Sequence, residues 1–160
     1  MPSVAKQSKK KYFLVTLIFM FVAGGVYYWW QMGELKWKDI SAGTLTFLKT
    51  SIVVEVANTP ELRRLGLGGR DTLDEKTGML FIFDTYSQPE LWMKDMKFAI
   101  DIIFFDRNFN VVDIKENFRP ESYPEVYISK EKAKYAVEVK SGFLKQYEIT
   151  PGNKAEFEAY

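Results

Sequence analysis

Five residues of the chain have types and spacing suited to binding a ligand. Arg64, Arg70, Trp92, Lys94 and Asp101 supply cations, an aromatic ring and a carboxylate. In a strand, Trp92 and Lys94 lie on one face because side chains alternate. An aromatic ring beside charged groups can stack on the apolar face of a sugar while its polar neighbours fix the orientation. The alternatives are that Trp92 is a half-buried core aromatic and that Lys94 is a solvated charge at the rim.

Asp101 stands out within this group because alternation places it on an otherwise apolar face, with Ile103 and Phe105. A carboxylate on such a face must be paired or hydrogen-bonded, since an isolated buried charge is very costly. We expect an ion pair with one of the three cations named above, which would hold the glycine-rich loop GLGGR (66–70) against the sheet. The alternative is an acid with a perturbed pKa that orients a ligand.

The loop GLGGR also has a cluster of arginines around it. Arg63 and Arg64 precede the loop and Arg70 ends it. Cations beside glycine amides can bind phosphate or carboxylate groups. Neither the GxxxxGKS/T nor the GxGxxG pattern accompanies them, so we expect these arginines to pair with acidic side chains instead.

The composition narrows the chemistry of any site. The chain contains no Cys and no His, which excludes thiol and imidazole catalysis and thiolate metal sites. We expect no cofactor and no metal site. Hydrolysis by two carboxylates, such as Asp101 and Glu138, remains available, but no motif fixes such a pair at a defined separation. A formal net charge of +1 does not favour a nucleic-acid partner.

The charge is distributed unevenly along the chain. Residues 1–11 carry four Lys residues and no acid, whereas residues 12–30 carry no charge at all. As a helix, the second segment spans about 28 Å at ~1.5 Å per residue, close to the hydrocarbon thickness of a bilayer. We therefore expect a single transmembrane helix from Tyr12 to Trp30. The alternative is a cleaved signal peptide, which would release a secreted domain.

The Lys cluster and the aromatic residues at the end of the apolar segment predict its orientation. Lys residues remain on the cytoplasmic side of a membrane, and Tyr and Trp concentrate at its interfaces. Residues 1–11 should therefore form a basic cytoplasmic tail, and residues 31–42 a juxtamembrane linker. The remaining residues, 43–160, should form one domain outside the cytoplasm.

Most segments of residues 43–160 have the composition of short strands. They are rich in β-branched and aromatic residues and too short for independent helices. The segments are 44–49, 51–57, 79–83, 91–94, 99–105, 110–115, 135–139 and 155–157. The three residues 106–108 suggest a hairpin turn. Many short strands without long intervening helices favour a sandwich or barrel over a parallel βαβ sheet.

The helices that we expect in this domain are few and short. Thr59 followed by Pro60 is typical of a helix start, and Gly66 should end that helix after two turns. Further short helical turns are expected at 129–132 and 141–147. The sequence thus predicts a mainly β fold, a jelly-roll-like sandwich or distorted barrel with one to three short helices, preceded by a single transmembrane helix.

A series of motifs in a fixed order resembles a known family. The motifs are VEVANTPELRRLGLGGR, GMLFIF, WMKDM, IDIIFFD, KYAVEVKSG and ITPGN. Together they are similar to the family called domain of unknown function 192. The resemblance implies a compact jelly-roll-like sandwich behind an export signal or anchor, and it implies no established reaction. The positions that match are Arg64, Gly66, Leu67, Arg70, Gly78, Met79, Phe83, Trp92, Met93, Lys94 and Asp101.

Together these features predict a membrane-anchored extracytoplasmic β-sandwich module with a binding or structural role at the cell envelope. Its partners would be the membrane, through residues 12–30, and an envelope polymer, a small ligand or a neighbouring protein. Two alternatives stay open. One is a carboxylate-dependent hydrolase acting on envelope glycan, although no catalytic motif is recognisable. The other is a scaffold partner of another membrane protein.

Overall fold

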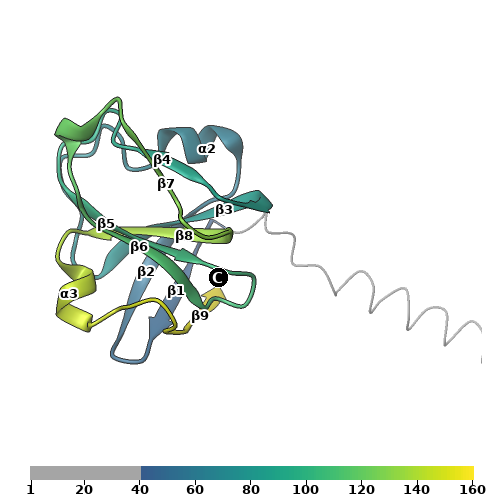
Figure 1. Cartoon of the computed structure of the whole chain (residues 1–160). Helices are drawn as coiled ribbons and strands as arrows, with labels where there is room; N and C mark the ends of the chain where they lie inside the picture. The colour runs from purple at the N-terminus through teal and green to yellow at the C-terminus, as the bar shows by residue number, and fades with distance from the viewer. Residues whose placement is uncertain (1–40) are drawn as a thin grey trace, which may run out of the picture. The chain divides into compact units, whose positions relative to one another are not determined.

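The computed structural model describes residues 41–160, which form a mainly β domain (Figure 1). The prediction of a mainly β fold with a few short helices is confirmed. The strands are β1 (Ala42–Phe47), β2 (Thr50–Ala57), β3 (Thr77–Ser87), β4 (Glu90–Trp92), β5 (Ile100–Phe105), β6 (Val111–Phe118), β7 (Val126–Ile128), β8 (Ala133–Lys140) and β9 (Ala155–Ala159). The helices are α2 (Pro60–Leu65), the 3₁₀ turn η2 (Pro120–Ser122) and α3 (Phe143–Tyr147).

The predicted tail (1–11), transmembrane helix (12–30) and most of the linker (31–42) lie outside the described residues. Within residues 41–160, no helix has the length and apolar character needed to cross a membrane.

Seven strands form one large sheet in the order β6-β5-β8-β3-β2-β1-β9, and β4 pairs with β7 in a small second sheet. All neighbouring strands are antiparallel except β2 and β3, which are parallel. The sequence did not predict this pair, which is joined by a crossover (58–76) containing α2. The large sheet curls without closing into a barrel: its edge strands β6 and β9 approach at a single bridge, Asn110 to Lys154.

The large sheet has a separate hydrophobic core on each face. One core contains the side chains of β1 and α3 together with Val137 and Val139 of β8. The other contains Ala136 of β8, and it is covered by Leu67 of the crossover and Leu91 of β4. Figure 1 shows α2, β4 and β7 on one side of β3 and β8, and α3 on the other. Strand β8 therefore contributes side chains to two differently covered layers.

Helix α2 begins and ends where the sequence predicts. Thr59 is its N-cap, with the hydroxyl accepting a hydrogen bond from the amide of Leu62, and Pro60 occupies the first turn. The helix ends at Gly66, whose φ of 54° lies in the region that favours glycine. The crossover therefore turns sharply at Gly66 and returns toward the sheet.

Two other local predictions had opposite outcomes. The hairpin turn is confirmed: the Asp106 carboxylate accepts hydrogen bonds from the amides of Asn108 and Asn110. The helical turn predicted at 129–132 is wrong. Ser129 is fully buried there, its amide donating to the Pro89 carbonyl and its hydroxyl donating to the Glu131 carbonyl. These contacts hold the segment as an irregular link between β7 and β8.

Asp101 is buried, as predicted, but the predicted ion pair is wrong. Its side chain is 2% exposed, and it accepts three backbone hydrogen bonds, from Asn117 (2.8 Å), Gly142 (2.9 Å) and Leu144 (3.0 Å). Gly142 is the N-cap of α3 and has no side chain with which to cap it, so Asp101 supplies the missing acceptor. Asn117 lies where the register of β5 and β6 shifts, and its amide is satisfied in the same way.

These three hydrogen bonds predict that Asp101 is a structural residue. Asp101→Ala should lower the free energy of unfolding by on the order of 3 kcal/mol, because buried amides lose their only side-chain acceptor. Asp101→Asn should cause a smaller loss, since it keeps one of the two acceptor oxygens. Denaturant unfolding of the full-length chain in detergent would measure both.

The matched control for Asp101 is Asp71→Ala, which removes an exposed partner of Lys97. That variant should leave the free energy of unfolding nearly unchanged. Equal effects of Asp71→Ala and Asp101→Ala would contradict a structural role for Asp101.

Candidate functional site

A groove of about 570 Å³ lies among α2, the second half of β3, and β4. This volume is within the range of small-molecule sites, about 300–1,000 Å³. The apolar part of its wall consists of Leu65, Leu67, Phe81, Phe83, Leu91 and Met96, with Trp92 beside them. The groove thus lies on the face of the sheet that the crossover and the small sheet cover.

Glu138 is the buried polar residue of this groove. On β8 it is paired in register with Met79 of β3 on one side and Ile102 of β5 on the other. Its side chain is 4% exposed, and it contributes to the lining of the groove. Its Oε2 atom is fully buried and has no hydrogen-bond partner among the described residues. Buried polar side chains normally have such a partner, so this oxygen needs an explanation.

Burial also changes the acidity of this carboxyl group. Loss of solvent raises the pKa of Glu138 to about 8, although the positive charge of Arg70 acts in the opposite direction. Arg70 cannot offset the burial, because its guanidinium is engaged with both oxygens of Glu55, at 2.6 and 2.7 Å. Glu138 is therefore mainly a neutral carboxylic acid at pH 7, able to donate a hydrogen bond as well as accept one.

The ion pair between Arg70 and Glu55 also changes the pKa of Glu55. The hydrogen bonds from Arg70 hold the pKa of Glu55 below its usual value. The expectation that the arginines around the loop pair with acids is thus confirmed for Arg70. It is also confirmed for Arg63, which donates to Asp84 (2.5 Å) and to the Ile82 carbonyl (2.7 Å).

Two cations that line the groove are not engaged in this way. Arg64 of α2 and Lys94, just after β4, both line it, and neither forms a salt bridge within residues 41–160. Glu90 and the Arg63-bound Asp84 also line the groove. The opening therefore carries charges of both signs, with two cations able to reorient toward a ligand.

Trp92 is 41% exposed, so its side chain is partly buried, as the alternative of a half-buried aromatic expects, and partly accessible to solvent. It lies on β4 opposite Val126 of β7. The predicted alternation is confirmed: Glu90, Trp92 and Lys94 are exposed, whereas the residues between them are buried. The indole is thus accessible to a ligand that enters the groove.

The structure brings together three of the five residues that the sequence singled out. Arg64, Trp92 and Lys94 all line the groove. Arg70 does not line it, being held by Glu55. Asp101 lies on the opposite face, because it is paired with Val139 whereas Glu138 is paired with the next residue of β5, and neighbouring residues of a strand point to opposite faces. The pairing of Asp101 with Glu138 for hydrolysis is therefore excluded.

Sequence reasoning did not select Glu138 as a ligand-binding residue, and named it only as a carboxylate available for hydrolysis. The available signal was its position between Val137 and Val139 in an apolar strand.

Residues 41–160 contain no group of three or more Asp and Glu side chains arranged to hold a metal ion.

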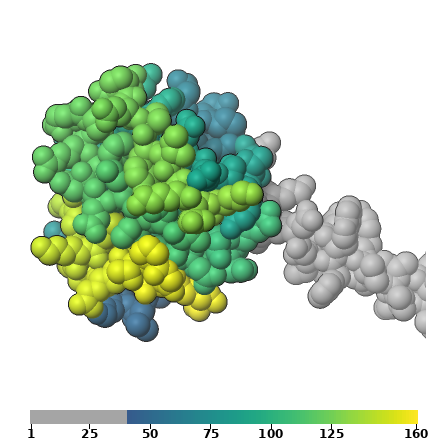
Figure 2. All heavy atoms as spheres, in the orientation of Figure 1, coloured from purple at the N-terminus to yellow at the C-terminus, as the bar shows by residue number. Residues whose placement is uncertain are grey.

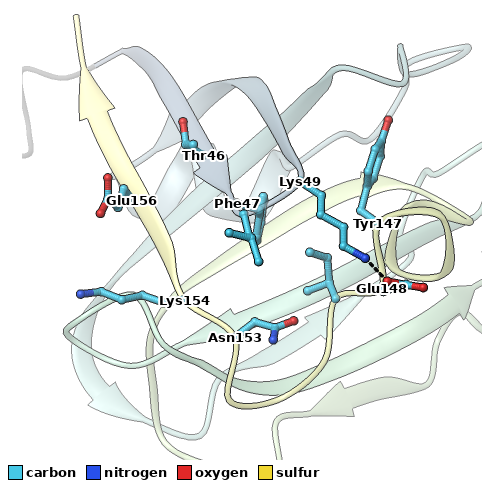
Figure 3. Close-up of a pocket in the computed structure, with 10 residues that line it drawn as sticks. Thr46, Phe47, Lys49, Tyr147, Glu148, Asn153, Lys154 and Glu156 are labelled. Atoms are coloured by element: carbon cyan, nitrogen blue, oxygen red, sulfur yellow. Dashed lines mark hydrogen bonds and ion pairs between the residues drawn. The ribbon is translucent and has the colours of Figure 1, made fainter.

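A second and larger cavity, about 710 Å³, lies between the β1–β2 turn and the segment from α3 to β9. Figure 2 shows the C-terminal segment beside the blue residues of that turn. Figure 3 shows Phe47 at its centre and Lys49 paired with Glu148 at its edge. No buried side-chain atom of this cavity lacks a partner. In this respect the cavity differs from the groove around Glu138.

Comparisons with known proteins match the described domain. The DUF192 family, described as "Uncharacterized ACR", matches residues 44–157. A crystal structure from Sinorhizobium meliloti 1021, of a protein provisionally named a transcription regulator, is 26% identical with a TM-score of 0.70. It covers 74% of this chain and 95% of its own. A protein of unknown function from Novosphingobium aromaticivorans DSM 12444 is 28% identical with a TM-score of 0.65, covering 73% and 84%. No curated protein matches.

The raised pKa of Glu138 predicts a specific dependence of stability on pH. The folded state holds the proton up to about pH 8, whereas the unfolded chain releases it near the ordinary value of 4.5. The free energy of unfolding should therefore fall as pH rises between these values, by a few kcal/mol at about 1.4 kcal/mol per pKa unit. Glu138→Gln should lack this component, so the variant gains stability relative to wild type from about pH 5 to about pH 9.

Chemical denaturation of both proteins across this range is the measurement. Glu116→Gln, at an exposed position of β6, is the control and should follow the wild-type curve. A constant difference between wild type and Glu138→Gln at all pH values would contradict the raised pKa.

Proposed function

The chain belongs to the DUF192 family, and from this starting point we propose that its β domain is a ligand-binding module. The binding site is the groove around Glu138. The observation that supports it is the buried Oε2 atom without a partner. A buried polar atom left unsatisfied costs about 1–3 kcal/mol, and a ligand that hydrogen-bonds to it would recover that cost.

The walls of the groove fit the same proposal. Leu67 and Phe81 are each 1% exposed, so the floor is apolar around a single polar atom. Trp92 at the opening offers an accessible aromatic face. Small-molecule sites combine apolar walls with a few well-placed polar groups in this manner. The ligand therefore needs an uncharged polar group for the floor and an apolar face for Trp92.

We further propose that this module works at the cell envelope. The supporting observations are the Lys-rich residues 1–11 and the uncharged residues 12–30, which would anchor the chain with its N-terminus in the cytoplasm. Residues 43–160 would then meet an envelope polymer, a small envelope ligand or a protein neighbour. Cleavage of a signal peptide would give the same domain in secreted form.

A hydrolase is a second candidate, favoured by one observation. A carboxyl group that keeps its proton near neutral pH is suited to act as a general acid. Its predicted partner Asp101 is on the other face of the sheet, so Glu90 or Asp84 of the groove would have to take the second role.

We do not propose that this chain is a transcription regulator, as the Sinorhizobium protein is provisionally named. Residues 31–160 carry 18 basic and 21 acidic side chains, a balance that does not favour binding to nucleic acid.

A thermal-shift screen of the full-length chain in detergent tests the binding function. The panel contains envelope glycan fragments, phospholipids and inorganic anions. A ligand at 100 times its Kd should stabilise the fold by about 2.7 kcal/mol. Trp92→Ala should weaken the binding of that ligand about tenfold, because stacking on the indole is lost.

Tyr123→Ala is the matched control for this screen. Tyr123 is an aromatic residue of similar exposure, 47%, that does not line the groove. It should leave the ligand-induced shift unchanged. Ligands whose effect survives both Trp92→Ala and Glu138→Leu would bind elsewhere and contradict the groove as the site.

The chain contains no Cys, so single cysteines introduced at chosen positions can test the proposed topology. Glu121→Cys, exposed on η2, should react with a membrane-impermeant maleimide in spheroplasts. Ser3→Cys in the basic tail should react only after permeabilisation. Labelling of Ser3→Cys but not of Glu121→Cys in intact spheroplasts would reverse the proposed orientation.

A further inference from the structure

We propose that the groove is specific for an N-acetylated sugar, with the acetamido group placed against Glu138 and the sugar ring against Trp92. This inference rests on the proposed binding function and names its ligand class. It depends on the geometry of the floor, on the hydrogen-bonding capacity of a neutral carboxyl group, and on the polar side chains at the opening.

The floor of the groove brings one polar atom and two apolar surfaces to a single point. A Cβ atom built on Gly66 would lie 3.7 Å from Oε2 of Glu138 and 3.5 Å from Cζ of Phe81. The backbone of Gly66, the edge of the Phe81 ring and the unpartnered oxygen therefore converge. A group that reaches this point must offer a polar atom to Glu138 and apolar surface to Phe81.

The charges around the floor exclude ionic groups there. A ligand ammonium would require Glu138 to lose its proton and would meet the positive charge of Arg70, which acts on this carboxyl group. A ligand carboxylate or phosphate could meet Arg64 and Lys94 at the opening, but in the floor it would have to leave water without a cation, because Arg70 is held by Glu55 and Arg63 by Asp84. The remaining candidates are neutral polar groups.

Among neutral groups, an acetamido group complements the floor most completely. Its carbonyl oxygen can accept the carboxyl proton of Glu138, while its N–H, which points the opposite way in a trans amide, stays available to the polar side chains at the opening. Its methyl group can lie against Phe81 and Leu67, both 1% exposed. A hydroxyl group can also hydrogen-bond to Glu138, but it has no methyl group for these apolar surfaces.

The opening of the groove favours a sugar as the carrier of this group. Trp92 is 41% exposed and can stack on the apolar face of a pyranose ring. Thr85 and Ser87, whose hydroxyl groups lie 3.2 Å apart, line the same groove together with Glu90. These three side chains can exchange hydrogen bonds with ring hydroxyl groups. An aromatic face with a row of small polar groups suits a polyhydroxylated ring better than an aliphatic amide.

The experiment compares two disaccharides that differ in the group at issue. Titration calorimetry of the full-length chain in detergent is carried out with N,N′-diacetylchitobiose and with cellobiose, which has hydroxyl groups in place of both acetamido groups. Wild type should bind diacetylchitobiose at least about tenfold more tightly, because cellobiose leaves the floor unfilled. Glu138→Leu should remove this preference, whereas Glu138→Gln should keep most of it, since an amide also donates and accepts.

The matched control is Glu121→Leu, which replaces an exposed carboxylate outside the groove and should keep the wild-type preference. Circular dichroism checks that each variant is folded. Equal binding of both disaccharides by wild type, or a preference that survives Glu138→Leu, would overturn the inference. If neither disaccharide binds while another ligand binds through Trp92, the acetamido assignment fails and the binding function stands. If no ligand of the panel depends on Trp92 or Glu138, both fail.

Discussion

A carboxyl group that is removed from water must either receive hydrogen bonds or keep its proton, and the three buried acids of this domain meet that constraint in two ways. Asp101 accepts hydrogen bonds from three backbone amides, and Asp113 accepts hydrogen bonds from the Tyr127 hydroxyl and the Lys130 amide. Both tie loops or helix ends to the large sheet. Glu138 has no such partner for Oε2 and instead has a raised pKa. This difference separates the two acids that hold loops and helix ends from Glu138, for which we propose a role in ligand binding.

The register of three central strands determines where each acid points. Strand β8 lies between β3 and β5, so Glu138 and Asp101, on neighbouring strands and offset by one residue, face opposite layers. The crossover (58–76) covers the Glu138 side, and its turn at Gly66 brings backbone rather than a side chain to the carboxyl group. The groove lies beside this point, lined by residues of α2, β3 and β4 together with Glu138.

Local signals in the sequence predicted eight of the nine strands, the helix start at Pro60 and its end at Gly66, because these depend on residues near in the chain; the short strand β7 (Val126–Ile128) was missed. The parallel β2–β3 pair and the partner of Asp101 could not be predicted, because they depend on strand order and register. Arg64, Trp92 and Lys94, which alternation and motif position grouped, all line the groove. Glu138 and Lys140 share one face of β8, and their apolar neighbours do not reveal that a second layer covers Glu138 while Lys140 stays exposed.

The central claim is that Glu138 remains protonated at neutral pH in the floor of a groove. The most direct test is a ¹³C NMR titration of the glutamate side-chain carboxyl groups in the full-length chain in detergent. The Glu138 resonance is the one that disappears in Glu138→Gln. We predict a midpoint near 8 and a shift of that resonance when a groove ligand binds. A midpoint near the ordinary value of 4.5 would contradict it.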